Sequence, residues 1–212
     1  MAKSSPDIKP RSIIDDAFLE LSRHDGNMAE HNDAGVTLEH IPFQGQFVLR
    51  ALEPLSDLNE VLEDILGTAL SNTPNHVSVN NQTKIFWLRE RQWHIVCPAD
   101  KSAALFNNIH AALKDMKSSI VDNSQGQTML RLSGERAADI LKKGCPLDIH
   151  DSVFPSGSMG LTRIVHADIL LHKISGQKFD IYVRQTMGEY LARWLHDGAL
   201  EYGVYIKSEN RS

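Results

Sequence analysis

The 212-residue sequence predicts an α+β protein built from two similar units, in which helices pack on antiparallel sheets. The first observation is the spacing of apolar residues, which has a period of two in some segments and a helical period in others. The second is the order of these segments, because two strands, a helix, further strands and a helix occur twice. We expect duplicated β-β-α-β-β-α type units at residues 36–118 and 119–205. Residues 1–35 would form an N-terminal arm and linker, and residues 206–212 a C-terminal tail.

The first 35 residues differ in composition from the rest of the chain. Residues 1–12 are polar and contain two prolines, so a loose arm is expected. Apolar residues then recur at helical spacing from Ile13 to Leu21, and Ser12 stands where an N-cap would be. Residues 22–35 are polar and contain glycine, as linkers do. The pattern leaves open whether this helix is disordered or packs on the remainder of the protein.

The first unit contains two predicted helices between its strands. Alternating apolar residues predict strands at residues 36–41, 46–52, 76–79, 84–88 and 92–97. The first helix should be capped by Ser56 and should end at Gly67, because glycine readily adopts a left-handed conformation. The second helix should be capped by Ser102, after Pro98 has ended the preceding strand.

The second unit repeats this order. Its strands are predicted at residues 120–122, 128–132, 161–166, 169–172 and 178–183. Ser133 is expected to cap the first helix and Gly144 to end it. Thr186 and Glu189 form a capping box for the second helix, which should end at Gly198.

The two units can also be aligned residue by residue at a few positions. Leu49 in the first unit corresponds to Leu130 in the second, and Ile95 corresponds to Ile181. Trp93, like Trp194 in the second unit, lies among apolar residues of the right period and is expected in a hydrophobic core. These matches support a duplicated fold.

Composition excludes several classes of protein. The formal net charge of −5 argues against nucleic-acid binding, which requires a basic surface. The longest apolar runs are far too short to span a bilayer, and the N-terminal residues lack the apolar segment of a secretory signal. Cys97 and Cys145 are the only cysteines, so no disulfide framework is indicated. We therefore expect a cytoplasmic protein that contacts neither nucleic acid nor membrane.

The sequence offers no catalytic, cofactor-binding or metal-binding residues. It contains neither GxxxxGK nor GxGxxG, so no nucleotide site is indicated. Ten histidines are present, but none forms the HxH, HxxH or HxxxH spacing of a metal site. Cys145 and His150 could act as nucleophile and base, but a buried structural cysteine is the better interpretation, with Asp148 bonding to loop backbone. A surface ion pair between Asp180 and Arg184 is also expected.

One segment carries a family resemblance. Residues 131–150 read RLSGERAADILKKGCPLDIH and are followed by Phe154 and Pro155. This segment resembles the signature of the gamma subunit of heterotetrameric sarcosine oxidase, in which a leucine-serine-glycine, an arginine-alanine pair and a glycine-cysteine-x-leucine-aspartate-x-histidine run precede phenylalanine-proline. Further matches lie at residues 37–50, 87–98 and 179–194, so that the resemblance covers about residues 35–200.

The resemblance implies a fold similar to the tetrahydrofolate-binding fold of aminomethyltransferases. It implies a non-catalytic subunit that acts in assembly with alpha, beta and delta subunits. Such a complex oxidatively demethylates sarcosine to glycine, with formation of hydrogen peroxide and methylene-tetrahydrofolate. FAD, FMN, NAD, tetrahydrofolate and zinc would then be bound by the partner subunits, and none by this chain.

Two alternative functions stay open at this point. The chain could be the gamma-type subunit of a related N-methyl-amino-acid dehydrogenase, such as N-methylglutamate dehydrogenase. It could also be a stand-alone folate-binding module, which should have a convergent pocket between its two lobes.

The connection between Cys145 and Ser158 is long for a compact domain and contains several apolar residues. Leu147 and Ile149 are expected to pack inside the chain. Phe154, beside Pro155, is expected to contact a partner subunit.

Overall fold

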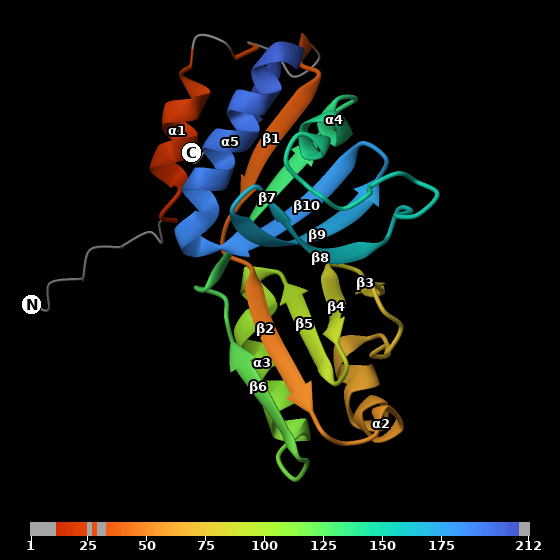
Figure 1. Ribbon diagram of the computed structural model, residues 1–212. Coiled ribbons are helices and arrows are strands. Elements are labelled where there is room, and N and C mark those ends of the chain that lie inside the picture. The colour runs from red at the N-terminus through yellow and green to blue at the C-terminus, as the bar shows by residue number, and fades with distance from the viewer. Residues whose placement is uncertain (1–11, 25–26, 29–32, 208–212) are drawn as a thin grey trace, which may run out of the picture.

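The computed structural model describes residues 12–24, 27–28 and 33–207, which form two lobes (Figure 1). Each lobe consists of one β-sheet with helices on one face. The expected loose arm lies almost entirely outside the described residues. Among the helices of the described ranges, none has the length and apolar character needed to cross a bilayer.

The five-stranded lobe has an antiparallel sheet with the strand order β3-β4-β5-β2-β6. Its strands are β2 (Gly45–Ala51), β3 (Val77–Asn80), β4 (Thr83–Arg89), β5 (Gln92–Cys97) and β6 (Ser118–Asp122). Its helices are α2 (Leu55–Leu66) and α3 (Ala99–Ala112). Alternate residues of the central strands, such as Leu49 and Ile95, pack in one core with these helices, which explains the period of two.

The six-stranded lobe has the strand order β11-β1-β7-β10-β9-β8, in which only the β1–β11 pair is parallel. Its strands are β1 (Val36–Ile41), β7 (Gln127–Ser133), β8 (Met159–Ile164), β9 (Ala167–Ser175), β10 (Lys178–Arg184) and β11 (Val204–Lys207). Its α-helices are α1 (Asp15–Ser22), α4 (Ala137–Lys142) and α5 (Gly188–Ala199). All three pack against the same face of the sheet.

The α+β class and the antiparallel sheets with packed helices are confirmed, and each unit contains two strands, a helix, three strands and a helix. The two units, however, exchange their first strands. β1 pairs with β7 of the second unit, and β6 pairs with β2 of the first. The short connections at residues 42–44 and 123–126 carry the chain directly from one sheet to the other (Figure 1). Each sheet therefore contains one strand from the other side of the predicted division between residues 118 and 119.

The strands chosen for the internal alignment occupy equivalent places in the two sheets, but their register differs. Ile95 lies opposite Phe47 on β2, whereas Ile181 lies opposite Leu130 on β7. The predicted match of Leu49 with Leu130 is therefore displaced by two residues. A shift of two keeps both leucines on the helix-covered side of their sheets.

The predicted side-chain caps are wrong. None of the four helices expected to start with Ser56, Ser102, Ser133 or Thr186 has a side-chain N-cap hydrogen bond. α2 and α3 instead begin directly after Pro54 and Pro98, whose φ angles of −56° and −57° are those that the proline ring imposes.

The predicted helix ends are only partly right. The left-handed exit at Gly67 is confirmed, with a φ of 70°. α4 instead leaves through a right-handed Lys143, and Gly198 lies within α5.

The N-terminal helix is part of the fold. Ile14, Phe18 and Leu21 are buried in the same core as α5. The helix therefore packs on the remainder of the protein, which the sequence had left open. At the other end of the chain, β11 was not predicted. It extends the sheet beyond β1 and includes Ile206 and Lys207, two residues of the expected tail.

The long connection after α4 folds back into the six-stranded lobe. Ile149 and Phe154 are both 4% exposed and belong to its core, and Leu147 packs beside them. The expectation that Phe154 contacts a partner is therefore wrong. The backbone N–H of Phe154 donates to the carbonyl of His150, and this turn directs the ring inward while Val153 faces solvent.

Candidate functional site

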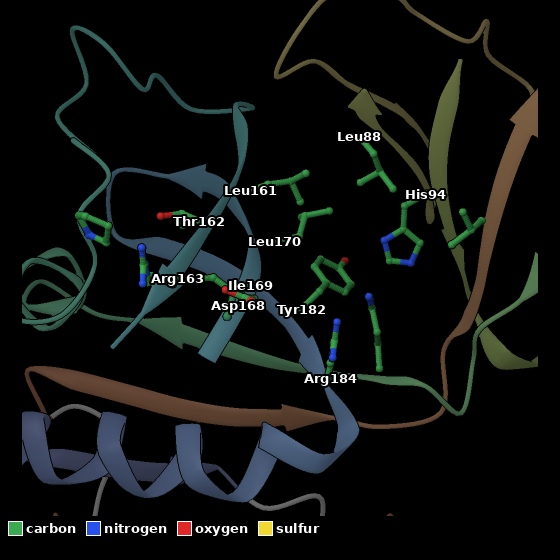
Figure 2. A pocket seen from close by; sticks show the side chains of 13 residues that line it. Leu88, His94, Leu161, Thr162, Arg163, Asp168, Ile169, Leu170, Tyr182 and Arg184 are labelled. Carbon is green, nitrogen blue, oxygen red and sulfur yellow. The ribbon is translucent and has the colours of Figure 1, made fainter. Parts of the chain in front are cut away.

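A groove lies between the two lobes (Figure 2). Its volume is about 620 Å³, and its walls come from β2, β4 and β5 of one sheet and from β7 to β10 of the other. Elsewhere between the sheets an apolar cluster that includes Phe86, Val96 and Met129 fills the space. The groove is thus a part of the lobe interface that the side chains of the described residues do not fill. We refer to it as the interlobe groove.

Three polar side chains line this groove where the sheets approach each other. His94 from β5 is 2% exposed, Tyr182 from β10 is 1% exposed, and their ring centroids are 5.8 Å apart. Within the described part of the chain, the Nε2 atom of His94, the hydroxyl of Tyr182 and the Oε1 atom of Gln127 have no hydrogen-bond partner. Buried polar groups are nearly always bonded, so these three atoms require an explanation.

Burial keeps both rings neutral. It lowers the pKa of His94 to about 4 and raises the pKa of Tyr182 well above its ordinary value. Neither group can exchange a proton readily near neutral pH, which general acid–base catalysis would require. The arrangement therefore suits recognition through hydrogen bonds more than proton transfer.

The mouth of the groove is charged. Arg163, Asp168 and Arg184 line it, and all three side chains are exposed. Arg163 and Asp168 face each other across β8 and β9. None of the ion pairs among the described residues includes Arg163 or Arg184. Two cationic groups and one carboxylate give this opening a positive balance, although the chain as a whole carries −5.

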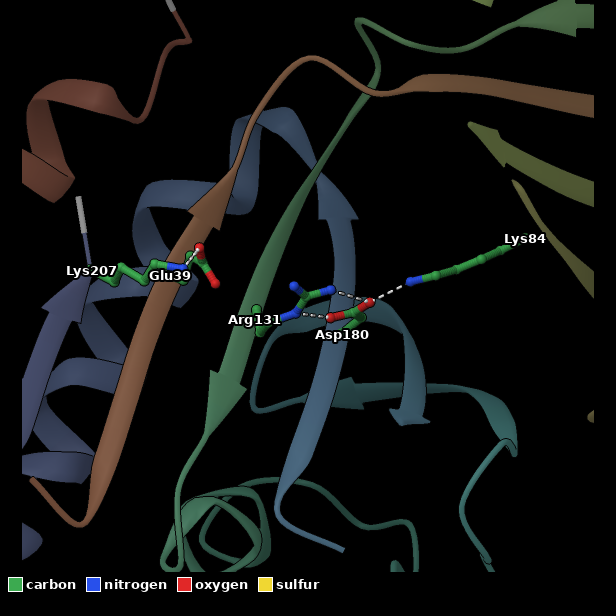
Figure 3. Close-up of polar contacts among 5 residues, drawn as sticks. All are labelled: Glu39, Lys84, Arg131, Asp180 and Lys207. Carbon is green, nitrogen blue, oxygen red and sulfur yellow. Dashed lines mark hydrogen bonds and ion pairs between the residues drawn. The ribbon is translucent and has the colours of Figure 1, made fainter. Parts of the chain in front are cut away.

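A buried ion cluster joins the lobes near the groove (Figure 3). Asp180 on β10 is fully buried and accepts hydrogen bonds from Nε of Arg131 at 2.7 Å and Nη2 of Arg131 at 3.1 Å. Lys84 on β4 of the other lobe donates to the same carboxylate at 2.6 Å. The expected surface pair of Asp180 with Arg184 is therefore wrong. β10 is a central strand that is covered on both faces. Asp180 is therefore buried, although it points away from the helix-covered side of the sheet.

The proposed nucleophile and base are not brought together. Cys145 is buried, with its sulfur 3.8 Å from Oγ1 of Thr162, and exposed His150 bonds through Nδ1 to Ser152 at 2.8 Å. Asp148 accepts a hydrogen bond from the backbone N–H of His150 at 3.0 Å, as predicted. Cys145 is thus structural, as its apolar surroundings suggested.

The nine histidines among the described residues are distributed over both lobes. Across the described ranges, no three His, Cys, Asp or Glu side chains are grouped as metal ligands. His172 is buried between the sheets, and burial lowers its pKa to about 4. His94 and His172, which both pack against Phe86, therefore form part of the packing between the lobes.

Sequence reasoning did not identify the groove. Its polar residues lie on strands that are buried on both faces, where a histidine or tyrosine among apolar residues looks like ordinary core. One signal was present in the first unit, since the predicted strand at residues 92–97, which is β5, contains no charged residue. Such strands are typical of the centre of a structure covered on both sides.

Comparison with known proteins places the fold and the family. The sarcosine oxidase, gamma subunit family matches residues 58–201, which is more than half of the chain. The chain belongs to this family. The sarcosine oxidase subunit gamma of Corynebacterium sp. (strain P-1) is 30% identical over 177 residues, covering 82% of this chain and 86% of the relative. The corresponding subunit of an Arthrobacter species is 29% identical, with the same coverage.

Two solved structures have a similar fold. A chain in heterotetrameric sarcosine oxidase from Corynebacterium sp. U-96 superposes with a TM-score of 0.81 and 24% identity, covering 94% of this chain and 99% of that one. Aminomethyltransferase T of the glycine cleavage system from Bartonella henselae has a TM-score of 0.59 and 15% identity. This superposition covers 91% of the present chain and 50% of the aminomethyltransferase. The expected likeness to the aminomethyltransferase fold is therefore confirmed.

Proposed function

We propose that this chain is the non-catalytic gamma subunit of a heterotetrameric sarcosine oxidase and acts in its assembly. The observation that carries the proposal is the family match over residues 58–201, together with relatives that share more than four-fifths of their length with this chain. The enzyme is an oxidoreductase, and its overall reaction is the oxidative demethylation of sarcosine to glycine. The chemistry would take place in other subunits.

The polar groups of the chain support a structural role. The buried carboxylate of Asp180 is occupied by ion pairs that connect the lobes, and burial holds His94 and His172 neutral. A catalytic group near neutral pH needs a pKa close to that pH and access to substrate. The described residues serve folding and recognition better than catalysis.

The alternatives are not favoured. The relatives that share most of their length with this chain are sarcosine oxidase gamma subunits, which favours sarcosine over another N-methyl amino acid. An interlobe groove does exist, as a folate-binding module would require. However, this chain spans half the length of the aminomethyltransferase that it resembles, so an independent folate site lacks half of that framework.

The proposal includes the identity of the partners and the place of the cofactors. Alpha, beta and delta subunits would bind this chain, and FAD, FMN, NAD, tetrahydrofolate and zinc would be held by them. Methylene-tetrahydrofolate and hydrogen peroxide would be products of the complex. We place the complex in the cytoplasm, which agrees with the two free, buried cysteines.

The proposal predicts different behaviour for the lone chain and the complex. Purified alone, the chain should show no flavin absorbance after desalting and should not oxidise sarcosine. When it is coexpressed with the other three subunits, sarcosine-dependent peroxide formation should co-elute with it. Omitting this chain should reduce the yield of intact complex. A flavin band that stays with the desalted lone chain would contradict the assignment.

A further inference from the structure

The walls of the interlobe groove carry exposed aliphatic side chains. Leu161 on β8 lines one wall and is 59% exposed. On the other side, Val48 lines the groove, and Val121 lies directly opposite it in the β2–β6 pair and is 58% exposed. Opposed residues of an antiparallel pair point to the same face, so Val121 extends that wall. Exposed aliphatic residues on both sides of one groove are typical of an interaction site.

The inner part of the groove offers hydrogen-bonding groups that the described chain does not use. His94, Tyr182 and Gln127 each present an unpartnered atom there, and the two rings are almost completely buried. Leaving a buried polar group unpaired costs about 1–3 kcal/mol. An extended peptide carries groups of matching chemistry, because a carbonyl can accept from a tyrosine hydroxyl and an N–H can donate to the amide oxygen of a glutamine.

The charge at the mouth selects the side chains of such a peptide. Arg163 and Arg184 are exposed at the opening, where Asp168 is the one carboxylate among the described lining residues. A guanidinium group binds a carboxylate through paired hydrogen bonds. An acidic side chain at the mouth and an aliphatic one between Leu88 and Leu161 would match the groove in both charge and polarity.

We propose that the interlobe groove receives an extended segment of a partner subunit in which an acidic residue lies close to an aliphatic one. This inference rests on the proposed function, since it requires that the chain has partner subunits. The groove would then be a docking site. The bound segment would extend the apolar cluster between the lobes, to which Phe86, Met129 and Leu170 belong.

Site-specific photocrosslinking in the assembled complex tests the proposal. Leu161 is replaced by the photoreactive amino acid p-benzoylphenylalanine, and Val153, 62% exposed on the loop after α4, carries the same group as the matched control. Irradiation at position 161 should produce one crosslink to another subunit, and mass spectrometry should locate it in a segment with adjacent acidic and aliphatic residues. Position 153 should not crosslink to that segment.

A charge reversal supplies a second readout. Arg184→Glu should lower the affinity of the chain for its partners by roughly tenfold or more, which corresponds to about 1.4 kcal/mol. Arg91→Glu, on the exposed turn between β4 and β5, is the control and should assemble normally. Melting of the lone Arg184→Glu chain should equal that of the parent, because Arg184 makes no ion pair with the described residues.

Several results would overturn the proposal while leaving the subunit assignment intact. These are a complex that forms without any crosslink at position 161, a crosslink only to a second copy of this chain, and normal assembly of Arg184→Glu. Stoichiometric binding of tetrahydrofolate to the lone chain, abolished by Arg184→Glu, would make the groove a small-molecule site instead. If no complex forms under any condition, the docking role and the proposed function fail together.

Discussion

Replacing Asp180 with asparagine should lower the free energy of unfolding by about 3 kcal/mol. Removing one partner of a buried ion pair typically costs 3–5 kcal/mol, because the remaining charge loses its compensation. The lower end is expected here, since Arg131 and Lys84 are 23% and 18% exposed and keep some contact with water. Urea denaturation of the purified chain at neutral pH measures the effect.

Asp139→Asn is the matched control for this substitution. Asp139 also contacts two cations, Arg136 at 3.3 Å and Lys142 at 3.1 Å, but its side chain is 33% exposed on the surface of α4. Surface pairs contribute about 0–1 kcal/mol, so this variant should unfold nearly as the parent does. If Asp180→Asn and Asp139→Asn lowered the free energy of unfolding equally, the Asp180 cluster would not stabilise the lobe interface.

The same cluster has a defined pH dependence. Burial alone would raise the pKa of Asp180, but hydrogen bonds from Arg131 and the charge of Lys84 outweigh it, and the net pKa is lower than usual. A carboxyl group with a lowered folded-state pKa stabilises the protein fully above its unfolded pKa of about 3.9 and loses that contribution as pH falls through the folded value. The stability difference between parent and Asp180→Asn should therefore be constant near neutral pH and shrink in acid.

Replacing Trp93 with alanine should cost about 3–5 kcal/mol, the usual range for a buried large aromatic residue. Trp93 is 2% exposed in the core of the five-stranded lobe, and its indole N–H donates to the carbonyl of Ser71 at 2.8 Å. For a chain of this length, the melting temperature should fall by roughly 6–20 °C. Differential scanning calorimetry of the variant measures this shift.

Trp194→Ala provides the comparison within the other lobe. Trp194 is only partly buried, packed on the edge of the core near Gly144, so its removal leaves a smaller cavity. Trp194→Ala should therefore lower the free energy of unfolding clearly less than Trp93→Ala does. An unchanged melting temperature for Trp93→Ala would place this side chain outside the core and contradict the described packing.

The order of elements could be predicted from the sequence because each strand and helix has its own local period. Helical spacing identified α2 and α5, and Gly67 was correctly assigned as a left-handed exit. The exchange of β1 and β6 between the sheets could not be predicted in this way. Both arrangements bury the same residues of each strand, so the apolar pattern does not distinguish them.

The polar sites were harder to predict for a related reason. Asp180 and Tyr182 alternate with core residues on β10, and a half-buried strand would expose them. The other lobe covers that face and buries both residues. Asp180 therefore accepts ion pairs, and Tyr182 lines the floor of the groove. β11 was missed because four residues at the end of the chain are too short to show a period.

This chain is one subunit of a four-subunit enzyme if the family assignment extends to its assembly. Native mass spectrometry of the complex isolated through a tag on this chain, after coexpression with the other three subunits, tests it most directly. We expect one dominant species that contains one copy of each subunit and oxidises sarcosine. A chain recovered alone or only as a homo-oligomer, while the other subunits assemble into active enzyme without it, would contradict the claim.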